Sequence, residues 1–435
     1  MVNILLIGNG AREHVIAEAI VLSPQKPKLF SYMNSNNPGI AKLSESVQIG
    51  KYNELDKINA FAQANAIDFA FIGPEDPLSQ GVVDSLEEVG VKSVGPKKEL
   101  AKLETSKSFT RLLMKKYSIS GLPAFRVFES KDGLKEYIDS MDAFVVKKDG
   151  LAGGKGVLVQ GDHFETKGDG FRIALDMIEN GDAVVIEEKL LGEEFSLMSL
   201  TDGKSLFDFQ PVQDHKRAFV GDKGPNTGGM GSYSTGKLLP FMTEKDLSDA
   251  RIITEKVLAA LKQETGLDYK GVMYGGFMIT KNGVKLIEYN ARFGDPEVMN
   301  VLPILKNDFV AVCQAVIDGT LSEIKPEFSS ESTVCKYAVP EGYPDNPVDG
   351  KKIFLGEVPK NVKVYYASVD KRNDGLYMSK SRAVAFVGIA PTLEEAEVIA
   401  ENGVCSAQGH IFHREDVGTK ELIDKRIKHM GKLRF

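Results

Sequence analysis

Short apolar strands alternate with helical patterns over about the first 100 residues, and this alternation limits the possible folds more than any other feature. Apolar runs occupy Asn3–Ile7, Lys28–Met33 and Phe69–Ile72, and helical patterns begin at about Arg12 and near Glu54–Asn65. A repeated strand–helix pattern is typical of an open parallel sheet. The sequence therefore predicts an α/β domain at the N-terminus.

Three glycines, Gly8, Gly73 and Gly95, follow directly on apolar strands. Because ligands of such sheets bind beyond the carboxyl ends of the strands, we expect these turns to line one edge of the domain. The Gly8–Glu13 turn lies between a strand and a helix, where backbone N–H groups and the helix dipole favour a phosphate. It matches half of a dinucleotide fingerprint, but Glu13 replaces the third glycine and no acidic ribose ligand follows the second strand. NAD is therefore disfavoured, and a tight turn without a ligand is the alternative.

A second glycine-rich segment, Lys147–Gly156, has four glycines and three lysines between two apolar strands. It is not a Walker P-loop, because a strand follows and Gly156 stands where a Ser or Thr would bind magnesium. Glycines let successive amides turn towards phosphate oxygens, and the lysines add positive charge. We expect this hairpin loop to close over a triphosphate; a surface hairpin without a ligand is the alternative.

The strand Leu286–Asn290 alternates, so the side chains of Glu288 and Asn290 point to the same side. Two oxygen ligands about 7 Å apart along one strand suit magnesium that also holds ATP phosphates. Arg292 follows at once and could bind a carboxylate or a transferring phosphoryl group. A polar strand with a structural role is the alternative.

A charged strand end, Gln213–Arg217, runs into the glycine-rich segment Gly224–Gly231. Long ordered loops of this kind usually hold ligands. Asp214 could pair with an ammonium group, and the amides of Asn226–Gly229 could bind a carboxylate or a phosphate. A merely exposed loop is the alternative, and His215 by itself does not indicate a general base.

The segment Val185–Glu194 places a strand before a linker and a second acidic pair. Such a strand can present backbone groups to an adenine edge, and a carboxylate can accept both ribose hydroxyls. Taken alone, the pattern favours acids that are simply solvated.

The bulk properties exclude several classes of protein. A chain of 435 residues implies two to four domains. The net charge is −7 and no stripe of Lys or Arg occurs, which argues against nucleic acid as a partner. The three cysteines match no disulfide or metal-ligand spacing and fit a reducing compartment. No stretch approaches the roughly 20 apolar residues of a membrane span, and the apolar start reads as a strand, not a signal, so we expect a cytoplasmic protein.

Taken together and in this order, the motifs resemble the phosphoribosylamine–glycine ligase family of ATP-grasp enzymes, also called glycinamide ribonucleotide synthetases. The motifs span about two thirds of the chain. They are Gly-Asn-Gly-Ala-Arg-Glu-His from Gly8, Gly-Pro-Glu-Asp-Pro-Leu from Gly73, Leu-Glu-Thr-Ser-Lys from Leu103, the Gly150 loop, Gln-Asp-His-Lys-Arg from Gln213, Gly-Pro-Asn-Thr-Gly-Gly-Met-Gly from Gly224, and Glu-Tyr-Asn-Ala-Arg-Phe-Gly-Asp-Pro-Glu from Glu288. The last three are specific, because other ATP-grasp enzymes share the lid and the metal strand but not the Asp-His-Lys-Arg and Asn-Thr-Gly-Gly pair.

The resemblance implies a multidomain α/β and α+β architecture. An N-terminal open parallel sheet domain over residues 1–103 would receive phosphoribosylamine. An ATP-grasp domain over 104–327 would carry an inserted lid at about 122–192, and a small α+β domain would occupy 328–435.

The resemblance also assigns roles to individual residues. The residues expected at the nucleotide are Lys107, Lys147, Gly153, Gly154, Lys155 and Gly156 for the phosphates, Glu187, Glu188 and Leu190 for adenine, and Glu194 for ribose. Glu288 and Asn290 are expected to bind Mg²⁺ or Mn²⁺. The residues expected at the two other substrates are Gly8, Asn9, Gly10, Arg12, Glu13 and Glu75 for phosphoribosylamine, with Asp214, Lys216, Asn226, Thr227, Gly228, Gly229, Arg292 and Asp295 completing the site. Asp214 and Arg292 are expected near the glycine substrate, and the resemblance implies Arg292, Asp214 and Lys147 as the catalytic residues.

The implied reaction joins glycine to 5-phosphoribosylamine at the expense of ATP, through a glycyl phosphate, in purine biosynthesis. One departure concerns the strand Gly271–Met278, which lacks the additional carboxylate that many ATP-grasp enzymes carry there. Three alternatives stay open: another ATP-grasp enzyme such as a carboxylase subunit or a formate-using transformylase, a nucleotide-sensing protein without turnover, and an NAD-linked dehydrogenase. The sequence leaves the oligomeric state open between monomer and dimer.

Overall fold

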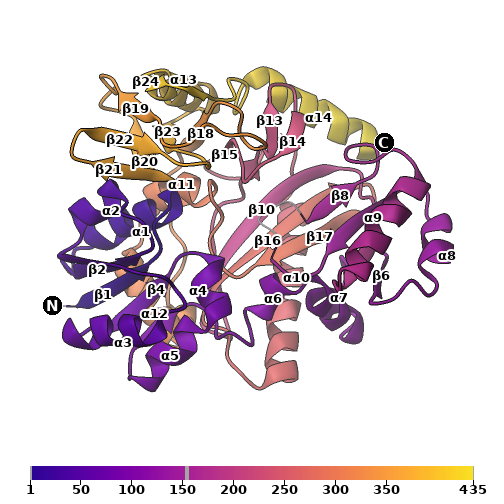
Figure 1. Ribbon diagram of the computed structural model, residues 1–435, viewed down its shortest axis with the longest axis horizontal. Coiled ribbons are helices and arrows are strands. Elements are labelled where there is room, and N and C mark those ends of the chain that lie inside the picture. Colours follow the sequence, from indigo (N-terminus) through magenta and orange to yellow (C-terminus); the bar gives the residue numbers. More distant parts are fainter. Residues whose placement is uncertain (1, 152–155, 435) are drawn as a thin grey trace.

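The computed structural model describes residues 2–151 and 156–434. Figure 1 shows an N-terminal sheet domain, a central sheet with a lid at its right, and a C-terminal domain above the N-terminal one. The multidomain α/β architecture predicted from the sequence is confirmed.

The N-terminal domain is an open parallel sheet with strand order β3-β2-β1-β4-β5. Its strands are β1 (Asn3–Ile7), β2 (Lys28–Met33), β3 (Ser46–Ile49), β4 (Phe69–Ile72) and β5 (Lys92–Val94). Its helices are α1 (Ala11–Val21), α2 (Pro38–Leu43), α3 (Leu55–Ala64), α4 (Glu75–Gln80) and α5 (Val82–Glu88). The apolar runs of β1 and β4 are buried on both faces, as expected of inner strands of a parallel sheet.

The segment between the N-terminal sheet and the lid forms two helices, α6 (Lys102–Thr105) and α7 (Lys107–Lys116). Ser106 between them is extended, and its hydroxyl accepts a hydrogen bond from Phe109 N at 3.1 Å. This N-cap starts a new helix, because a serine side chain can replace the missing backbone acceptor.

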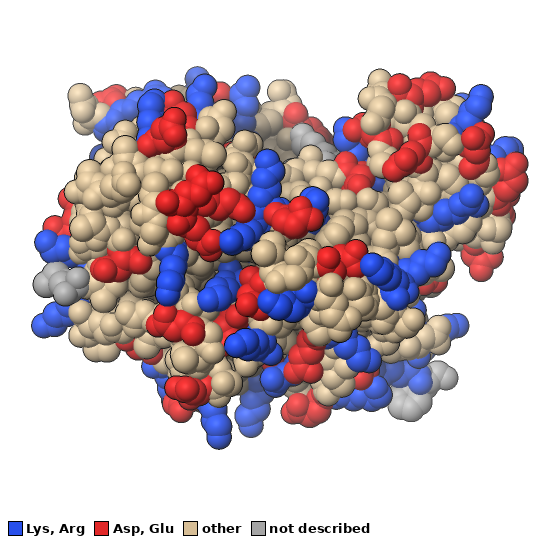
Figure 2. Space-filling model, turned by 90° about the horizontal axis from the view of Figure 1, so that it is seen from below, with Lys and Arg blue, Asp and Glu red and all other residues tan. Residues whose placement is uncertain are grey.

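The lid is an antiparallel sheet with order β6-β9-β7-β8 and two helices, and it has a hydrophobic core of its own. Its elements are β6 (Phe125–Phe128), α8 (Leu134–Asp139), β7 (Phe144–Lys148), β8 (Val157–Val159), α9 (Lys167–Glu179) and β9 (Val184–Glu188). Figure 2 shows the lid at the right, separated from the rest of the molecule by a hollow.

The central sheet has order β11-β10-β16-β17 and is antiparallel. Its elements are β10 (Glu193–Thr201), β11 (Leu206–Asp208), α10 (Glu244–Thr265), β16 (Gly271–Thr280) and β17 (Gly283–Asn290). After β17 the chain forms α11 (Val298–Val301), η1 (Leu302–Ile304), α12 (Phe309–Asp318) and η2 (Leu321–Glu323).

The C-terminal sheet has order β12-β15-β18-β23-β20, so it includes two strands from the middle of the chain. Its strands are β12 (Gln213–Asp214), β15 (Gly231–Ser234), β18 (Ser332–Pro340), β20 (Lys363–Tyr366) and β23 (Val384–Ala390), and β25 (Ile411–Phe412) pairs with β18. β12 carries the start of the Gln213–Arg217 motif, and β15 links it to β18 of the C-terminal domain.

The remaining elements are short strands and two C-terminal helices. They are the hairpin β13 (Arg217–Phe219) and β14 (Lys223–Asn226), the small sheet of β19 (Lys352–Leu355), β21 (Val369–Arg372), β22 (Gly375–Met378) and β24 (Ala407–Gly409), and the helices α13 (Leu393–Val404) and α14 (Lys420–Arg434). Figure 1 shows α14 running across the top of the molecule towards the lid. Within residues 2–151 and 156–434, no helix combines the length and the apolar character that a membrane crossing needs.

Candidate active site

Strand β17 presents Glu288 and Asn290 to one side, as its alternation predicts. Tyr289 between them is buried in the core, and its hydroxyl hydrogen-bonds the Thr254 hydroxyl on α10 at 3.0 Å. Backbone pairing sets Glu288 opposite Gly276 of β16, which has no side chain to pack against the carboxylate.

Four cationic side chains from distant segments act electrostatically on Glu288. Burial alone would raise the pKa of this carboxyl group, but the positive charges of Lys216 and Lys147 outweigh it and hold the pKa below its ordinary value. Lys107 and Arg292 act in the same direction. Glu288 is therefore ionised at neutral pH, and the positive charges of these four side chains favour its ionised form.

Lys147 of the lid is buried in an ionic cluster with Glu187 and Arg111. Glu187 Oε2 lies 2.7 Å from Lys147 Nζ, and Glu187 Oε1 lies 2.6 Å from Arg111 Nε. Lys147 Nζ also donates to the carbonyl of Ile287, next to Glu288, at 2.9 Å. This cluster fastens the lid sheet to β17.

The loop after β7 approaches the start of α7. Lys107 Nζ donates to Gly150 O at 2.9 Å, and Asp149 accepts a hydrogen bond from Ser108 N. Gly156 is buried at the far end of the loop. Gly153, Gly154 and Lys155 lie outside the described residues.

The other residues expected at the nucleotide lie along the link from β9 to β10. Glu188 Oε1 accepts a hydrogen bond from Ala124 N at 2.9 Å, and Leu190 is half-buried. Glu194 Oε2 lies 3.0 Å from Lys216 Nζ. Glu194 therefore joins the link between β9 and β10 to the Gln213–Arg217 motif.

Arg292 lies between two carboxylates of the N-terminal segments. Its Nε donates to Glu75 Oε2 at 3.1 Å, and its Nη2 lies 3.0 Å from Glu104 Oε1. Burial would raise the pKa of Glu75, but the charges of Arg292 and Arg12 lower it to about 2. The third guanidinium donor, Nη1, hydrogen-bonds Phe293 O.

The Gly8 turn is closed by the side chain of Glu13, which stands where the dinucleotide fingerprint has glycine. Glu13 Oε2 accepts a hydrogen bond from Gly10 N at 2.5 Å, and Glu13 Oε1 accepts one from Arg12 Nε at 2.5 Å. Gly8 has φ +133°, and a Cβ there would lie 2.4 Å from Glu13 Cγ, so only glycine fits. The Gly10 amide, which could otherwise donate to a phosphate, is therefore bonded to this carboxylate.

A small pocket of about 250 Å³ lies beyond the same edge of the sheet. Its lining residues are Asn34, Lys51, Tyr52, Asn53, Asp76 and Gln80. Tyr52 Oη donates to Asn9 Oδ1 at 2.7 Å, which connects the pocket to the Gly8 turn. Lys51 and Asp76 were not singled out from the sequence, although the rule that ligands bind beyond strand ends points to their positions.

Asp214 stands at the end of β12 among other acids. Removal from solvent raises the pKa of this carboxyl group to about 7, and the nearby charges of Glu297 and Glu194 act in the same direction. Lys216 opposes the shift. An incoming ammonium group would relieve this cost.

The raised pKa of Asp214 predicts a pH-dependent gain in stability for Asp214→Asn. The folded state binds the proton more tightly than the unfolded state, so stability falls as pH rises from about 3.9 to about 7. Asparagine does not titrate, so Asp214→Asn avoids this fall in stability. The variant should raise the free energy of unfolding by at most about 4 kcal/mol at about pH 8 and should change it little at about pH 4. Denaturant unfolding at both pH values measures the difference; a variant that is less stable at the higher pH would contradict the assignment.

The Asn226–Gly229 loop is held from two sides. Thr227 Oγ1 donates to Lys216 O at 2.8 Å, and Arg382 of the C-terminal domain donates to Gly228 O at 2.7 Å. Asn226 ends β14 and pairs with Arg217.

Arg382 also contacts Asp295. The sequence did not indicate Arg382 as a site residue. Its Nη1 donates to Asp295 O at 2.7 Å and lies 3.3 Å from Asp295 Oδ1. A Cβ on Gly10 would lie 3.8 Å from Asp295 Oδ2. Arg382 therefore joins the C-terminal domain to the point where the Gly8 turn, the Gly228 loop and the segment after β17 meet. No local pattern around Arg382 indicates this role.

The wide groove of about 870 Å³ between α10, the β10–β11 turn and η2 contains none of the expected site residues. It lies apart from the cationic cluster around Glu288. The candidate site is the polar junction of the lid, β17, β12 and the N-terminal turns.

Comparison with known proteins identifies the family. The phosphoribosylglycinamide synthetase N domain matches residues 2–104, the ATP-grasp (A) domain matches 105–298, and the C domain matches 333–420. The chain is 50% identical over 444 residues to phosphoribosylamine–glycine ligase of Methanocaldococcus jannaschii, with 99% of each chain covered. It is 47% identical over 433 residues to the same ligase of Methanococcoides burtonii, covering 99% of this chain and 100% of that one.

A solved structure agrees with these matches. The crystal structure of phosphoribosylamine–glycine ligase from Thermotoga maritima superposes with a TM-score of 0.81 at 28% identity, covering 95% of this chain and 100% of that one. The three family domains occur in the same order along this chain as its folded units. The chain therefore belongs to the phosphoribosylglycinamide synthetase family.

Proposed function

We propose that the protein joins glycine to 5-phosphoribosylamine while ATP is cleaved to ADP and phosphate, and that the junction around Glu288 is its active site. The observation that supports this most strongly is the convergence of Lys107, Lys147, Lys216 and Arg292 on one ionised carboxylate. The ionised carboxylate can bind a metal ion. The metal ion and the cationic side chains can together stabilise the negative charge of a triphosphate.

Glu288 and Asn290 would hold the divalent ion, Mg²⁺ or Mn²⁺. Both ligands are oxygen donors on one side of β17, and Glu288 is charged, which fits a hard cation. When bound, the ion would neutralise charge on the transferring phosphoryl group. Asn290 Oδ1 accepts a hydrogen bond from Arg292 Nη2 at 3.3 Å, so this guanidinium stands beside the proposed ligand.

The nucleotide would lie between the lid and the central sheet. Lys107, Lys147 and the amides of the Lys147–Gly156 loop would bind the phosphates, and Glu194 the ribose. Glu187, Glu188 and Leu190 would frame adenine. Because the Glu187 carboxylate is buried between Lys147 and Arg111, Glu187 would contribute its backbone rather than its side chain.

The two other substrates would meet at the edge of the N-terminal sheet. Asp214 would pair with the ammonium group of glycine, and Arg292 with its carboxylate. The Gly8 turn, Arg12 and Glu75 would bind phosphoribosylamine, and the Asn226–Gly229 loop with Asp295 would close the site.

The reaction then proceeds in two displacements. A carboxylate oxygen of glycine attacks the γ-phosphorus of ATP, the bond to the bridging oxygen breaks, and ADP leaves. The amine of phosphoribosylamine attacks the acyl carbon of the glycyl phosphate, phosphate leaves with the bonding electron pair, and the amine loses a proton. Neither step needs a nucleophile from the protein, so positioning and exclusion of water by the lid would carry catalysis.

A coupled assay of ADP release tests this function. Continued release of ADP over many turnovers should require ATP, glycine and freshly generated phosphoribosylamine together, with glycinamide ribonucleotide as product, because the amine is what consumes the glycyl phosphate. Release that requires bicarbonate or formate instead would indicate a different ATP-grasp enzyme. ATP binding without ADP release under any combination would indicate a nucleotide sensor.

Arg382→Ala is expected to lower kcat/KM for phosphoribosylamine about 100-fold, the effect of a misplaced binding group. The variant loses three hydrogen bonds that hold Gly228, Gly229 and Asp295 in place. Steady-state kinetics with each substrate varied in turn measures the effect. Arg372→Ala on the exposed β21 strand is the matched control and should retain wild-type kinetics; equal losses in both variants would argue against a specific role of Arg382.

A further inference from the structure

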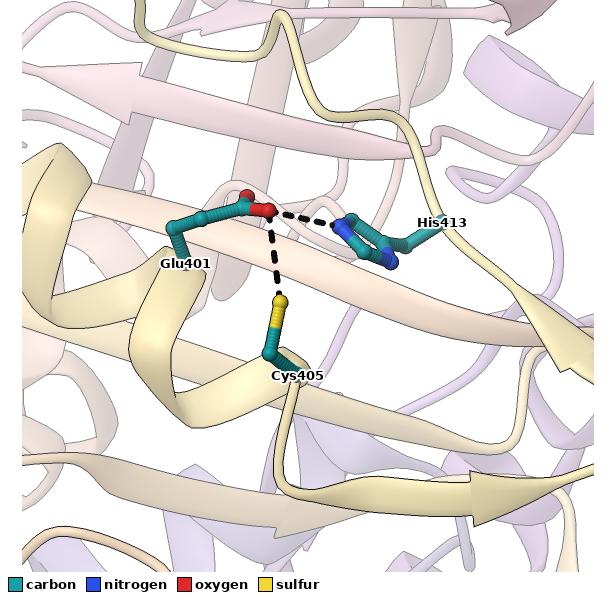
Figure 3. Close-up of side chains that lie close together, drawn as sticks. All are labelled: Glu401, Cys405 and His413. Atoms are coloured by element: carbon teal, nitrogen blue, oxygen red, sulfur yellow. Dashed lines mark hydrogen bonds and ion pairs between the residues drawn. The ribbon is translucent and has the colours of Figure 1, made fainter.

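Three different metal-ligating side chains meet in the C-terminal domain, away from the candidate active site. Glu401 and Cys405 lie one turn apart at the end of α13, and His413 follows β25. We refer to these three residues as the α13 triad. Figure 3 shows all three side chains pointing towards one another.

The donor atoms of the triad are already close together. Glu401 Oε1 lies 3.0 Å from His413 Nε2 and 3.4 Å from Cys405 Sγ, and all three donors lie within 4.8 Å of one another. In a tetrahedral zinc site the donors lie about 3.3 to 3.6 Å apart, given Zn–N and Zn–S distances of about 2.0 and 2.3 Å. The triad therefore needs only a small adjustment to bind one ion.

The second oxygen of Glu401 is fixed by a buried lysine. Lys336 Nζ donates to Glu401 Oε2 at 2.5 Å, to Glu397 Oε1 at 2.6 Å and to Glu415 O at 2.7 Å. This leaves Oε1 to face the other two ligands. Contacts of this kind around a ligand orient it and strengthen metal binding.

The charges near the triad also favour a cation. Glu397 and Glu401 carry two negative charges, whereas Lys336 carries one positive charge. Loss of the Cys405 proton would add a further negative charge. A divalent ion would compensate this excess. Cys405 is exposed, whereas the two other thiols, Cys313 and Cys335, are buried, so the triad is the cysteine site that a metal in solution can reach.

We propose that Glu401, Cys405 and His413 bind a late first-row divalent ion, of which Zn²⁺ is the best match, with water in the fourth position. The mixed sulfur, nitrogen and oxygen set selects against Mg²⁺, which requires oxygen ligands, so this site is chemically distinct from the one at Glu288. The ion would tie α13 to the segment that leads through Arg414 into α14. The proposal does not depend on the proposed function.

Titration of the metal-free full-length protein with Co²⁺ tests the site. Thiolate ligation to Co²⁺ should give a charge-transfer band in the near ultraviolet, which saturates at one ion per chain, persists in excess Mg²⁺ and disappears when Zn²⁺ is added. Sites made of oxygen ligands alone, such as the one proposed at Glu288, cannot give this band.

The band should be lost in Cys405→Ser and strongly weakened in His413→Ala. His410→Ala, an exposed histidine in the same segment, is the matched control and should retain it. Thermal unfolding of Cys405→Ser without metal should match the wild type, because the side chain is exposed. Absence of the band in the wild type, or its persistence in both triad variants, would overturn the proposal.

Discussion

Glu288→Gln is expected to lower kcat by about 1,000-fold or more while the protein stays folded. The amide keeps the volume of the side chain but removes the charge that faces Lys147, Lys216, Lys107 and Arg292. A group that stabilises transition-state charge typically contributes about 100- to 1,000-fold, and loss of the metal adds to this. Single-turnover ADP formation at saturating Mg²⁺ or Mn²⁺ measures the effect.

A matched control for this variant is Glu129→Gln, on the exposed surface of the lid. It makes the same chemical change away from β17 and should retain full activity. Cooperative thermal unfolding of Glu288→Gln would show that the loss is not one of folding. Activity within a few-fold of wild type would contradict the role of Glu288 as a metal ligand.

Glu187→Ala is expected to destabilise the protein by about 3 to 5 kcal/mol, because it leaves Arg111 and Lys147 as buried charges without their partner. Burial would raise the pKa of Glu187, but these two cations lower it. Glu187 therefore makes its full contribution to stability above about pH 4.3, the ordinary pKa of a glutamate side chain. This contribution is lost as the pH falls through the lower pKa that Glu187 has in the folded state. Denaturant unfolding at about pH 7 measures the loss.

The control for Glu187→Ala is Glu179→Ala at the exposed end of α9 in the same lid, which should change stability by less than about 0.5 kcal/mol. In the double variant Glu187→Leu with Lys147→Met, part of the loss should be recovered, because one buried charge is removed together with its partner. Equal stability of Glu187→Ala and Glu179→Ala would show that the cluster does not fasten the lid.

Most of the N-terminal domain could be predicted from the sequence, because its signal is local. Buried parallel strands such as Phe69–Ile72 are continuous apolar runs, and each ends in a turn residue that marks its boundary. The alternation over Glu288–Asn290 likewise predicts that Glu288 and Asn290 lie on one side of the strand, and both are part-exposed on either side of buried Tyr289. The alternation predicted from Leu286 onwards is wrong at Ile287, where a β-bulge shifts the pairing with β16 and leaves Leu286 buried in the core, as Tyr289 is.

Features that depend on contacts between distant segments could not be predicted. Arg382 contacts the Gly228 loop and Asp295 only because β12 and β15 join the C-terminal sheet, and no local pattern encodes that pairing. Glu187 reads as a solvated acid in the sequence, yet Arg111 on α7 makes it a buried ion-pair partner. The domain boundaries near residues 103 and 327 and the ligand roles of the site residues stay predictions.

The most direct test of the proposed active site is a crystal structure with a non-hydrolysable ATP analogue and Mg²⁺. We predict that the metal lies on Glu288 and Asn290 and that the triphosphate lies between β17 and the Lys147–Gly156 loop, within reach of Lys107 and Lys147. A nucleotide bound elsewhere, with the metal away from β17, would contradict the proposed site.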